Sequence, residues 1–180
     1  MGAARCFWAA HGPAAAILGA MLTMIVSGGQ TGVDRAALDA ALAADLDVGG
    51  WCPGGRRAED GAIPAVYPLT ETPHQAYRQR TEWNVRDSDA TLILTRGAIS
   101  GGTALTVQFA HAQRRPHRIV RLDRPGTLAD EPAATMDWIA ENRIATLNVA
   151  GPRESLRPGI YDGARAFMAR LIDDALAHYA

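Results

Sequence analysis

The chain has 180 residues, 48% of them hydrophobic and 21% charged, with a formal net charge of −1. This length predicts one domain, and this composition is typical of a globular protein and excludes a chain that is mainly disordered. Because 18 basic side chains face 19 acidic ones, the charge gives no support for nucleic acid or a membrane surface as a partner. All 18 basic residues are arginine, so a bound anion would be held by guanidinium groups, backbone N–H groups or hydroxyls.

Residues 1–20 differ from the rest of the chain. They hold one arginine and an apolar stretch broken by His11, Gly12 and Pro13, which spoils the apolar region that a signal peptide needs. The apolar run over residues 14–26 is shorter than the about 20 residues that a membrane span requires. We therefore expect a disordered leader or start-site extension over residues 1–20, one ligand-binding domain over residues 21–180, and a cytoplasmic protein.

Short apolar runs alternate with helical patterns from residue 23 onward. In chain order, the sequence predicts a strand over 24–26, a helix over 33–46, a weak strand over 47–51, an irregular loop over 52–72, a polar helix over 74–88, a strand over 90–95, a glycine loop over 96–102, a helix over 103–113, a strand over 118–122, a short helix over 135–142 and a strand over 144–149. Thr31 and Asp34 have the spacing of a capping box, which places the start of the first helix at the end of a glycine loop.

The last helix is predicted by apolar residues at i, i+3, i+4 and i+7 spacing. Its expected buried face comprises Ala164, Phe167, Met168, Leu171, Ile172, Ala175, Leu176 and Tyr179.

Strands that alternate with helices predict an α/β fold, namely a Rossmann-like, doubly wound parallel sheet of about five strands with helices on both faces. In such a sheet, ligands bind beyond the carboxyl ends of the strands, where the strand order reverses. If the first strand is central, the loop over 27–32 lies beside the loop over 96–103 at that point. The loop over 151–155 then emerges at the same edge.

These three loops contain glycine and directly follow predicted strands. Glycine lets the backbone approach a ligand closely, and the helix N-terminus that follows favours a phosphate-like anion. The first loop, SGGQTG, matches neither G-x-G-x-x-G nor a Walker sequence. Each loop alone is explained as well by a tight structural turn, but together at one sheet edge they favour an anionic or nucleotide-like ligand.

Four arginines flank the loops. Arg56 and Arg57 lie in the long irregular loop, Arg96 opens the second glycine loop and Arg153 lies in the third. One such residue is usually a solvated surface charge, whereas several near one rim would suit phosphate or another oxyanion.

The polar helix over 74–88 supplies further candidates. Tyr77, Arg80, Asn84 and Asp87 share one helical face, which either lines the site or faces solvent. The candidate ligand-binding residues are Ser27, Gly28, Gly29, Gln30, Thr31, Gly32, Arg56, Arg57, Arg80, Asn84, Arg96, Ser100, Gly101, Gly102, Thr103, Arg153, Glu154 and Ser155.

Other chemistries have little support. The five histidines show no metal-ligand spacing and no serine lies in a G-x-S-x-G elbow, so we expect no metal site and no serine nucleophile. Cys6 and Cys52 match neither a disulfide framework nor a zinc motif. Cys52 lies beside an arginine pair that would lower its thiol pKa, although a small packed residue explains it better. Glu59 and Asp60 either supply a carboxylate to the site or anchor their loop.

Six segments carry a resemblance to a known family: IVSGGQTGVDRAALDAAL, GGWCPGGRRAEDG, YPLTET, RTEWNVRDSDATLIL, SGGTALT and LNVAGPRES. With them, the stretch from about Met24 through the final helix resembles the molybdenum carrier family, a Rossmann-like relative of the cytokinin-activating phosphoribohydrolases. The resemblance implies a homo-oligomer that binds and protects the molybdenum cofactor, a pterin carrying a phosphate and an oxo-molybdenum centre. It also implies molybdoenzymes as recipients of that cargo.

Two departures from the related patterns bear on function. The position of Gly54 is commonly lysine in the carrier family, so one cationic contact is missing here. The phosphoribohydrolases carry P-G-G-x-G-T-x-x-E, whereas residues 100–108 read SGGTALTVQ, with Gln108 near the place of the glutamate. We therefore expect a binding protein rather than an enzyme, with the molybdenum cofactor or a similar anionic pterin or nucleotide as its ligand. The alternatives are a nucleotide N-glycosidase, in which Glu59 or Glu82 supplies the carboxylate, and a nucleotide sensor.

Overall fold

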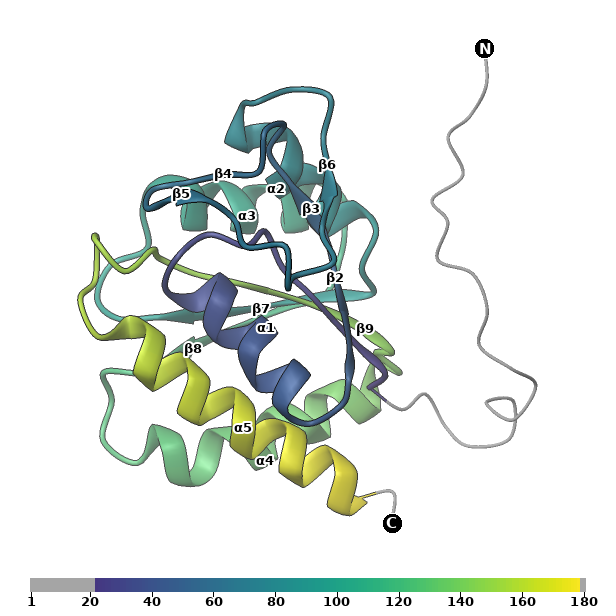
Figure 1. Ribbon diagram of the computed structural model, residues 1–180. Helices are drawn as coiled ribbons and strands as arrows, with labels where there is room; N and C mark the ends of the chain where they lie inside the picture. The colour runs from purple at the N-terminus through teal and green to yellow at the C-terminus, as the bar shows by residue number, and fades with distance from the viewer. Residues whose placement is uncertain (1–21, 179–180) are drawn as a thin grey trace.

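The computed structural model describes residues 22–178, so the leader predicted over 1–20 and Tyr179 lie outside the described residues. Its centre is a sheet of five strands in the order β2-β1-β9-β7-β8 (Figure 1). The strands are β1 (Met24–Val26), β2 (Asp47–Gly49), β7 (Ala90–Thr95), β8 (His117–Arg121) and β9 (Thr146–Ala150). Every pairing between neighbours in this sheet is parallel, which confirms the predicted α/β fold.

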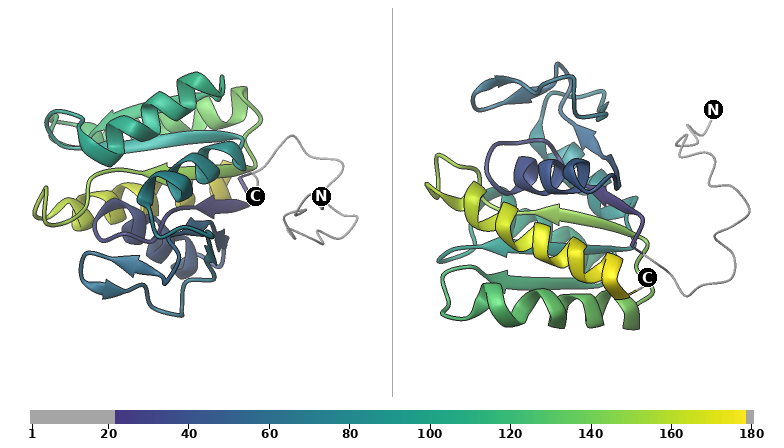
Figure 2. Two further views of the ribbon diagram at one scale, coloured as in Figure 1. Left: turned by 90° about the horizontal axis from the view of Figure 1, so that it is seen from above. Right: turned by 60° about the horizontal axis from the view of Figure 1, so that its bottom comes forward.

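Five helices within residues 22–178 cover both faces of the sheet. They are α1 (Val33–Ala43), α2 (Tyr77–Arg86), α3 (Gly101–Ala112), α4 (Thr127–Glu141) and α5 (Ile160–His178). Helices α1, α4 and α5 pack together on one face, while α2 and α3 pack together on the other (Figures 1 and 2). The large apolar core lies under the first group, and a small cluster of Val85, Phe109 and Ala110 joins α2 to α3.

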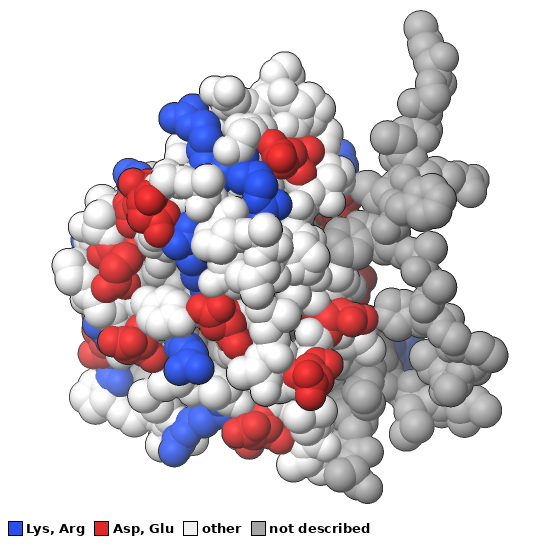
Figure 3. Space-filling view, viewed as in Figure 1, with Lys and Arg blue, Asp and Glu red and all other residues white. Residues whose placement is uncertain are grey.

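Helix α5 buries nearly all of its predicted face. Six of the predicted residues, from Ala164 to Ala175, are at most 4% exposed, but Leu176 is 45% exposed, so its assignment to the buried face is wrong. At ~100° per residue, Leu176 lies about 100° from the centre of the buried stripe, where it no longer faces the sheet. None of the helices within residues 22–178 combines the length and apolar character needed to cross a bilayer. On the face shown in Figure 3, acidic and basic side chains are interspersed.

The strand at the centre of the sheet is β9, because β9 pairs with both β1 and β7, so the condition that the first strand is central is not met. If β9 and α5 preceded β1 in the chain, the strands would follow the order 3-2-1-4-5 of a Rossmann sheet. The chain is therefore a circular permutation of that arrangement. The helix after β9 lies on one face and the helix after β7 on the other, so the strand order reverses between β9 and β7. That point is where a doubly wound sheet binds its ligand.

The cap of α1 and the start of α3 differ from the prediction, although α1 begins at Val33 as predicted. The N-cap of α1 is Gly32, with no side-chain cap bond, so the predicted Thr31–Asp34 capping box is wrong. The Thr31 hydroxyl instead accepts a hydrogen bond from Glu154 N (3.3 Å) and donates to Glu59. Helix α3 begins at Gly101, so Gly101 and Gly102 form its first turn and are not part of the preceding loop.

Helix α4 begins eight residues before the predicted position 135 and runs through Pro132. Proline has no N–H to donate to the carbonyl four residues earlier, which here belongs to Leu128. Arg170 Nη1 of α5 donates to that carbonyl instead (2.5 Å). A contact from another helix thus compensates for the proline, and local sequence carries no sign of it.

The predicted irregular loop contains short strands. β3 (Trp51–Cys52) pairs in parallel with β6 (Thr70–Glu71), and β4 (Arg57–Ala58) forms an antiparallel hairpin with β5 (Gly61–Ala62). Cys52 is fully buried in a cluster with Leu38, Ile63, Tyr67 and Leu69. This burial raises the pKa of the Cys52 thiol although Arg56 lowers it, so Cys52 is a packed residue.

Candidate functional site

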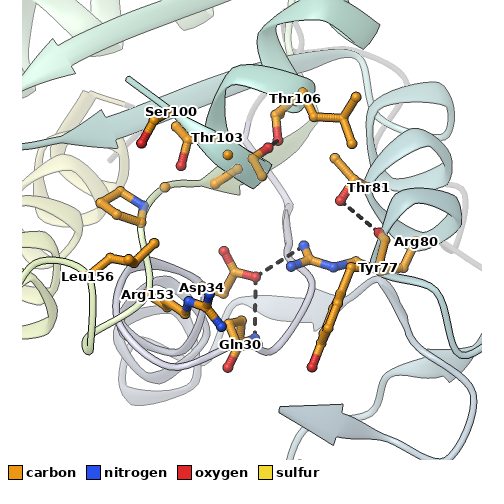
Figure 4. Close-up of a pocket in the computed structure, with 16 residues that line it drawn as sticks. Gln30, Asp34, Tyr77, Arg80, Thr81, Ser100, Thr103, Thr106, Arg153 and Leu156 are labelled. Atoms are coloured by element: carbon orange, nitrogen blue, oxygen red, sulfur yellow. Dashed lines mark hydrogen bonds and ion pairs between the residues drawn. The ribbon is translucent and has the colours of Figure 1, made fainter. Parts of the chain in front are cut away.

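A cavity of about 250 Å³ opens where the carboxyl ends of β9 and β7 meet (Figure 4). Its walls come from the first turn of α1, from α2, from the first turns of α3 and from residues 150–153 after β9. The structure thus brings the ends of all three predicted glycine loops to one edge of the sheet. At ~30 Å³ per molecule of liquid water, the volume equals about eight waters, which is room for part of a nucleotide-sized ligand.

One wall of the cavity is the N-terminus of α3. Ser100 is the N-cap residue but makes no side-chain cap bond. Thr103 is only 6% exposed and lines the cavity. A Cβ atom on Gly101 or Gly102 would meet no atom within 4 Å, so the space beside the first turn is open. The first N–H groups of a helix lack intrahelical acceptors and carry partial positive charge, so this wall suits an anion.

The opposite wall carries Asp34, whose side chain is 4% exposed. One carboxylate oxygen accepts a hydrogen bond from Gln30 N (3.3 Å) and pairs with Arg80 Nη1 (3.2 Å), while the other points into the cavity (Figure 4). Desolvation raises the pKa of Asp34 more than Arg80 lowers it. Asp34 is the one acidic residue among the described residues that line the cavity, and it offers a hydrogen-bond acceptor.

Arg80 lies under the cavity and against the first glycine loop. A Cβ atom at Gly28 would lie 2.0 Å from Arg80 Nη1, so only glycine allows the guanidinium to approach this backbone. Arg80 Nε is buried without a partner among the described residues, and Tyr77 and Thr81 of the same helix also line the cavity. On the polar face predicted for α2, Arg80 and Asn84 are largely buried whereas Tyr77 is 37% exposed, so this face lies partly against the protein and partly in solvent.

Most of the loop over 27–32 serves contacts within the protein. Ser27 is fully buried and donates to Val149 O (2.7 Å), which ties β1 to β9. Gly32 has φ +76°, and a Cβ there would lie 2.6 Å from Pro152 O, so glycine permits the close approach of the first and third loops. Of the predicted residues in this loop, Gln30 alone lines the cavity, while Gly28, Gly29 and Thr31 lie behind it.

Four further predicted residues hold the fold together. Arg56 donates to four main-chain carbonyls within residues 63–69, and Asn84 pairs with both the N–H and the carbonyl of Trp51. The Glu154 carboxylate accepts from two N–H groups at the start of α5. Arg96 lies against the backbone of that same helix start. These four side chains contact main-chain atoms and do not line the cavity. Arg57, a fifth predicted residue, is exposed beside Gln75 and does not line the cavity either.

A second polar cluster adjoins the cavity and is centred on Glu59, whose side chain is 17% exposed. Its carboxylate accepts hydrogen bonds from the hydroxyls of Thr31 and Ser155 and from Ser155 N (3.2 Å), and it lies 3.4 Å from Arg153 Nε. Desolvation raises the pKa of Glu59, but the hydrogen bonds from Ser155 and Thr31 outweigh it and the pKa is lowered. Glu59 is therefore an anchoring carboxylate that stays ionised at neutral pH.

The sequence analysis missed Asp34 as a cavity residue because its spacing from Thr31 suggested a helix cap. A different signal was present. Asp34 occupies the same helical stripe as Leu38 and Ala41, which are fully buried, so a charged residue stood in an apolar stripe. Gln108 and Glu82 do not line the cavity, and Gln108 is exposed.

Comparisons with known proteins agree with this architecture. The sequence pattern of the Circularly permutated YpsA SLOG family matches residues 25–172. The crystal structure of a protein from Syntrophus aciditrophicus SB, named "putative molybdenum carrier protein", superposes with a TM-score of 0.82. The two chains are 43% identical, and the match covers 84% of this chain and 96% of the other. Among proteins with curated descriptions, none matches.

The family description and the strand order describe the same feature, since the last strand, β9, takes the place that the first strand has in a Rossmann sheet. The resemblance to the molybdenum carrier family is also confirmed. The chain belongs to the Circularly permutated YpsA SLOG family.

Proposed function

We propose that the protein binds a small anionic ligand, the molybdenum cofactor or a similar anionic pterin or nucleotide, in the cavity between β9 and β7. The observation that carries this proposal is the open N-terminus of α3, where Ser100 makes no side-chain cap bond and where Ser100 and Thr103 line the cavity opposite a buried acceptor, Asp34. The name of the 43% identical protein from Syntrophus aciditrophicus SB supports the choice of a molybdenum-related ligand.

The chemistry of the cavity fits such a ligand at both ends. A phosphate would accept hydrogen bonds from the first N–H groups of α3 and from the Ser100 and Thr103 hydroxyls. The inward oxygen of Asp34 would accept an N–H or O–H group at the other end, and the Tyr77 ring offers a surface for a flat heterocycle. Arg153, with a side chain 44% exposed at the rim, would meet a second oxyanion. The molybdenum cofactor supplies a phosphate, a pterin and an oxo-metal group.

The nucleotide N-glycosidase remains an alternative because Asp34 gives the cavity a carboxylate. Glu59 is occupied by Thr31, Ser155 and Arg153, and Glu82 does not line the cavity, so a hydrolase would depend on Asp34. Hydrolysis of nucleoside monophosphates that Asp34→Asn abolishes would establish the enzyme. Binding without release of free base would support the carrier, and a nucleotide sensor would differ from it only in the ligand bound.

The cellular setting is part of the same proposal. We propose a cytoplasmic homo-oligomer whose ligand-binding domain spans residues 21–180 and whose cargo passes to molybdoenzymes.

The test compares Thr103→Val with Thr135→Val. Both threonines are buried, but Thr103 lines the cavity whereas Thr135 lies on α4 and does not. Binding of the molybdenum cofactor and of guanosine 5′-monophosphate is measured by calorimetry under anaerobic conditions. Thr103→Val should weaken binding about tenfold or more, since a hydrogen bond to a charged group contributes ~1.5–3 kcal/mol. Thr135→Val should bind as the unmodified protein does. Equal affinity of all three proteins, or no binding, would refute the proposal.

A further inference from the structure

Beside the cavity, three residues that the sequence predicted to bind an anion instead contact a carboxylate of the protein itself. Thr31, Arg153 and Ser155 come from two different glycine loops, and all three contact Glu59. One Glu59 oxygen accepts from the Thr31 hydroxyl and from Ser155 N (3.2 Å). The other accepts from the Ser155 hydroxyl and lies 3.4 Å from Arg153 Nε.

This donor set is larger than a surface ion pair needs. An exposed salt bridge joins one cation to one carboxylate, whereas here two hydroxyls, a backbone N–H and a guanidinium converge on one anion. The same combination of donors is typical of sites for phosphate and other tetrahedral oxyanions. The cluster therefore has the chemistry of an oxyanion site that a side chain fills.

Glu59 is carried by an exposed element. The hairpin of β4 and β5, residues 57–62, has two strand pairs, and one small apolar side chain, Ala58, packs against the cluster around Cys52. Glu59 N donates to Gln30 Oε1 (2.9 Å), and Asp60 pairs with Arg35. A two-stranded hairpin with little apolar burial is marginally stable, so moving it exposes little apolar surface.

The oxyanion cluster is continuous with the cavity. Arg153 and Gln30 both line the cavity, and both also contact Glu59, through its carboxylate and its N–H respectively. A ligand whose first anionic group lies at the N-terminus of α3 would therefore meet a second group of donors at the border of the same cavity.

We propose that Thr31, Arg153 and Ser155 form a second oxyanion site, which Glu59 fills in this structure, and that a ligand with two anionic groups displaces Glu59 and releases the hairpin over residues 57–62. The first anionic group rests on the function proposed above, and the second site is a separate claim about the ligand class. The preferred ligands are then diphosphates, or phosphates that carry a second oxyanion.

The experiment uses inorganic phosphate and pyrophosphate as probes in calorimetric titrations. Glu59→Ala removes the internal anion and should add a second phosphate site, at least about tenfold tighter than any second site in the unmodified protein. Asp60→Ala is the matched control, because it loosens the same hairpin but leaves Glu59 on its donors, and it should add no site. In the Glu59→Ala protein, a further Arg153→Ala change should remove the added site.

A second measurement needs no variant. Hydrogen exchange of the amides over residues 57–62 should become faster when the unmodified protein is saturated with pyrophosphate, because the hairpin is released. Unchanged exchange at saturation, or a folded Glu59→Ala protein with no additional phosphate site, would overturn the inference and leave Glu59 as a simple anchor. An added site in Glu59→Ala without any binding to the unmodified protein would support the oxyanion site of Thr31, Arg153 and Ser155, but it would refute the α3 site and the displacement of Glu59 by a ligand, so the claims fail separately.

Discussion

Replacing Arg80 with methionine should destabilise the fold by about 3 kcal/mol at neutral pH, because it removes the partner of a buried carboxylate. Asp34 and Arg80 side chains are 4% and 14% exposed, and Nη1 lies 3.2 Å from Oδ2. At an effective dielectric constant of about 20, charges at this separation attract by about 5 kcal/mol. After Arg80 is replaced, the hydrogen bond from Gln30 N and water in the cavity still stabilise the Asp34 carboxylate, so the loss is smaller than this attraction. Breaking a buried pair typically costs about 3–5 kcal/mol.

The loss should depend on pH in a defined direction. Desolvation raises the pKa of Asp34 above its usual 3.8 despite Arg80, so near that pH and somewhat above it the folded protein binds more protons than the unfolded one. The contribution of Asp34 to stability therefore falls as pH rises through the raised pKa. Without Arg80 the pKa rises further, so the penalty of Arg80→Met should be largest at neutral pH and shrink as the solution becomes acidic enough to protonate Asp34.

The assay is urea unfolding followed by tryptophan fluorescence at acidic and neutral pH. Adding Asp34→Asn to Arg80→Met should restore most of the lost free energy of unfolding, since the stranded group is then neutral. Arg86→Met is the control on the same helix, where an exposed pair with Asp87 should contribute less than about 1 kcal/mol. If Arg80→Met cost no more than this control, or cost the same at both pH values, the reasoning about a desolvated carboxylate would be wrong.

Three further predictions follow from single contacts. Arg56→Ala should lower the free energy of unfolding by about 2–3 kcal/mol and speed hydrogen exchange over residues 63–69, since four carbonyls lose a charged donor; unchanged exchange there would contradict this. Glu154→Ala should cost about 1 kcal/mol in chemical denaturation, because its carboxylate caps α5, and no loss would show that water replaces it. A chain that begins at Met21 should melt at the same temperature as the full chain, because the first backbone hydrogen bond at the start of β1 is donated by Thr23 N to Ala145 O, just before β9. A lower melting temperature would assign residues 1–20 a role in the fold.

Local sequence was sufficient for the class of fold but not for its strand order. The run over residues 90–95, ATLILT, is mostly apolar and is fully buried in β7, and the 3.6-residue spacing located α5. Periodicity, however, says nothing about which strands pair. The central place of β9 depends on its pairing with β1 and β7, more than 50 residues away in sequence, and no local pattern encodes such a pairing.

The candidate site was predictable where backbone chemistry determines it. Glycine loops after parallel strands indicated the correct sheet edge, and Ser100 to Thr103 line the cavity. Side-chain partners were not predictable for Arg56 and Asn84, since their guanidinium and amide groups bind main-chain atoms of a segment whose path the sequence did not reveal. Asp34 was missed because its spacing from Thr31 suggested a helix cap, although its spacing from Leu38 and Ala41 also placed it on the buried stripe of α1.

The most direct test of the central claim is a titration of the isotope-labelled protein with a phosphate monoester, followed through its backbone amide resonances. Binding at the N-terminus of α3 predicts saturable shifts centred on the amides of Gly101, Gly102 and Thr103, and weaker binding in Thr103→Val. Shifts centred elsewhere on the chain, or none at all, would contradict the assignment of this cavity as the anion-binding site.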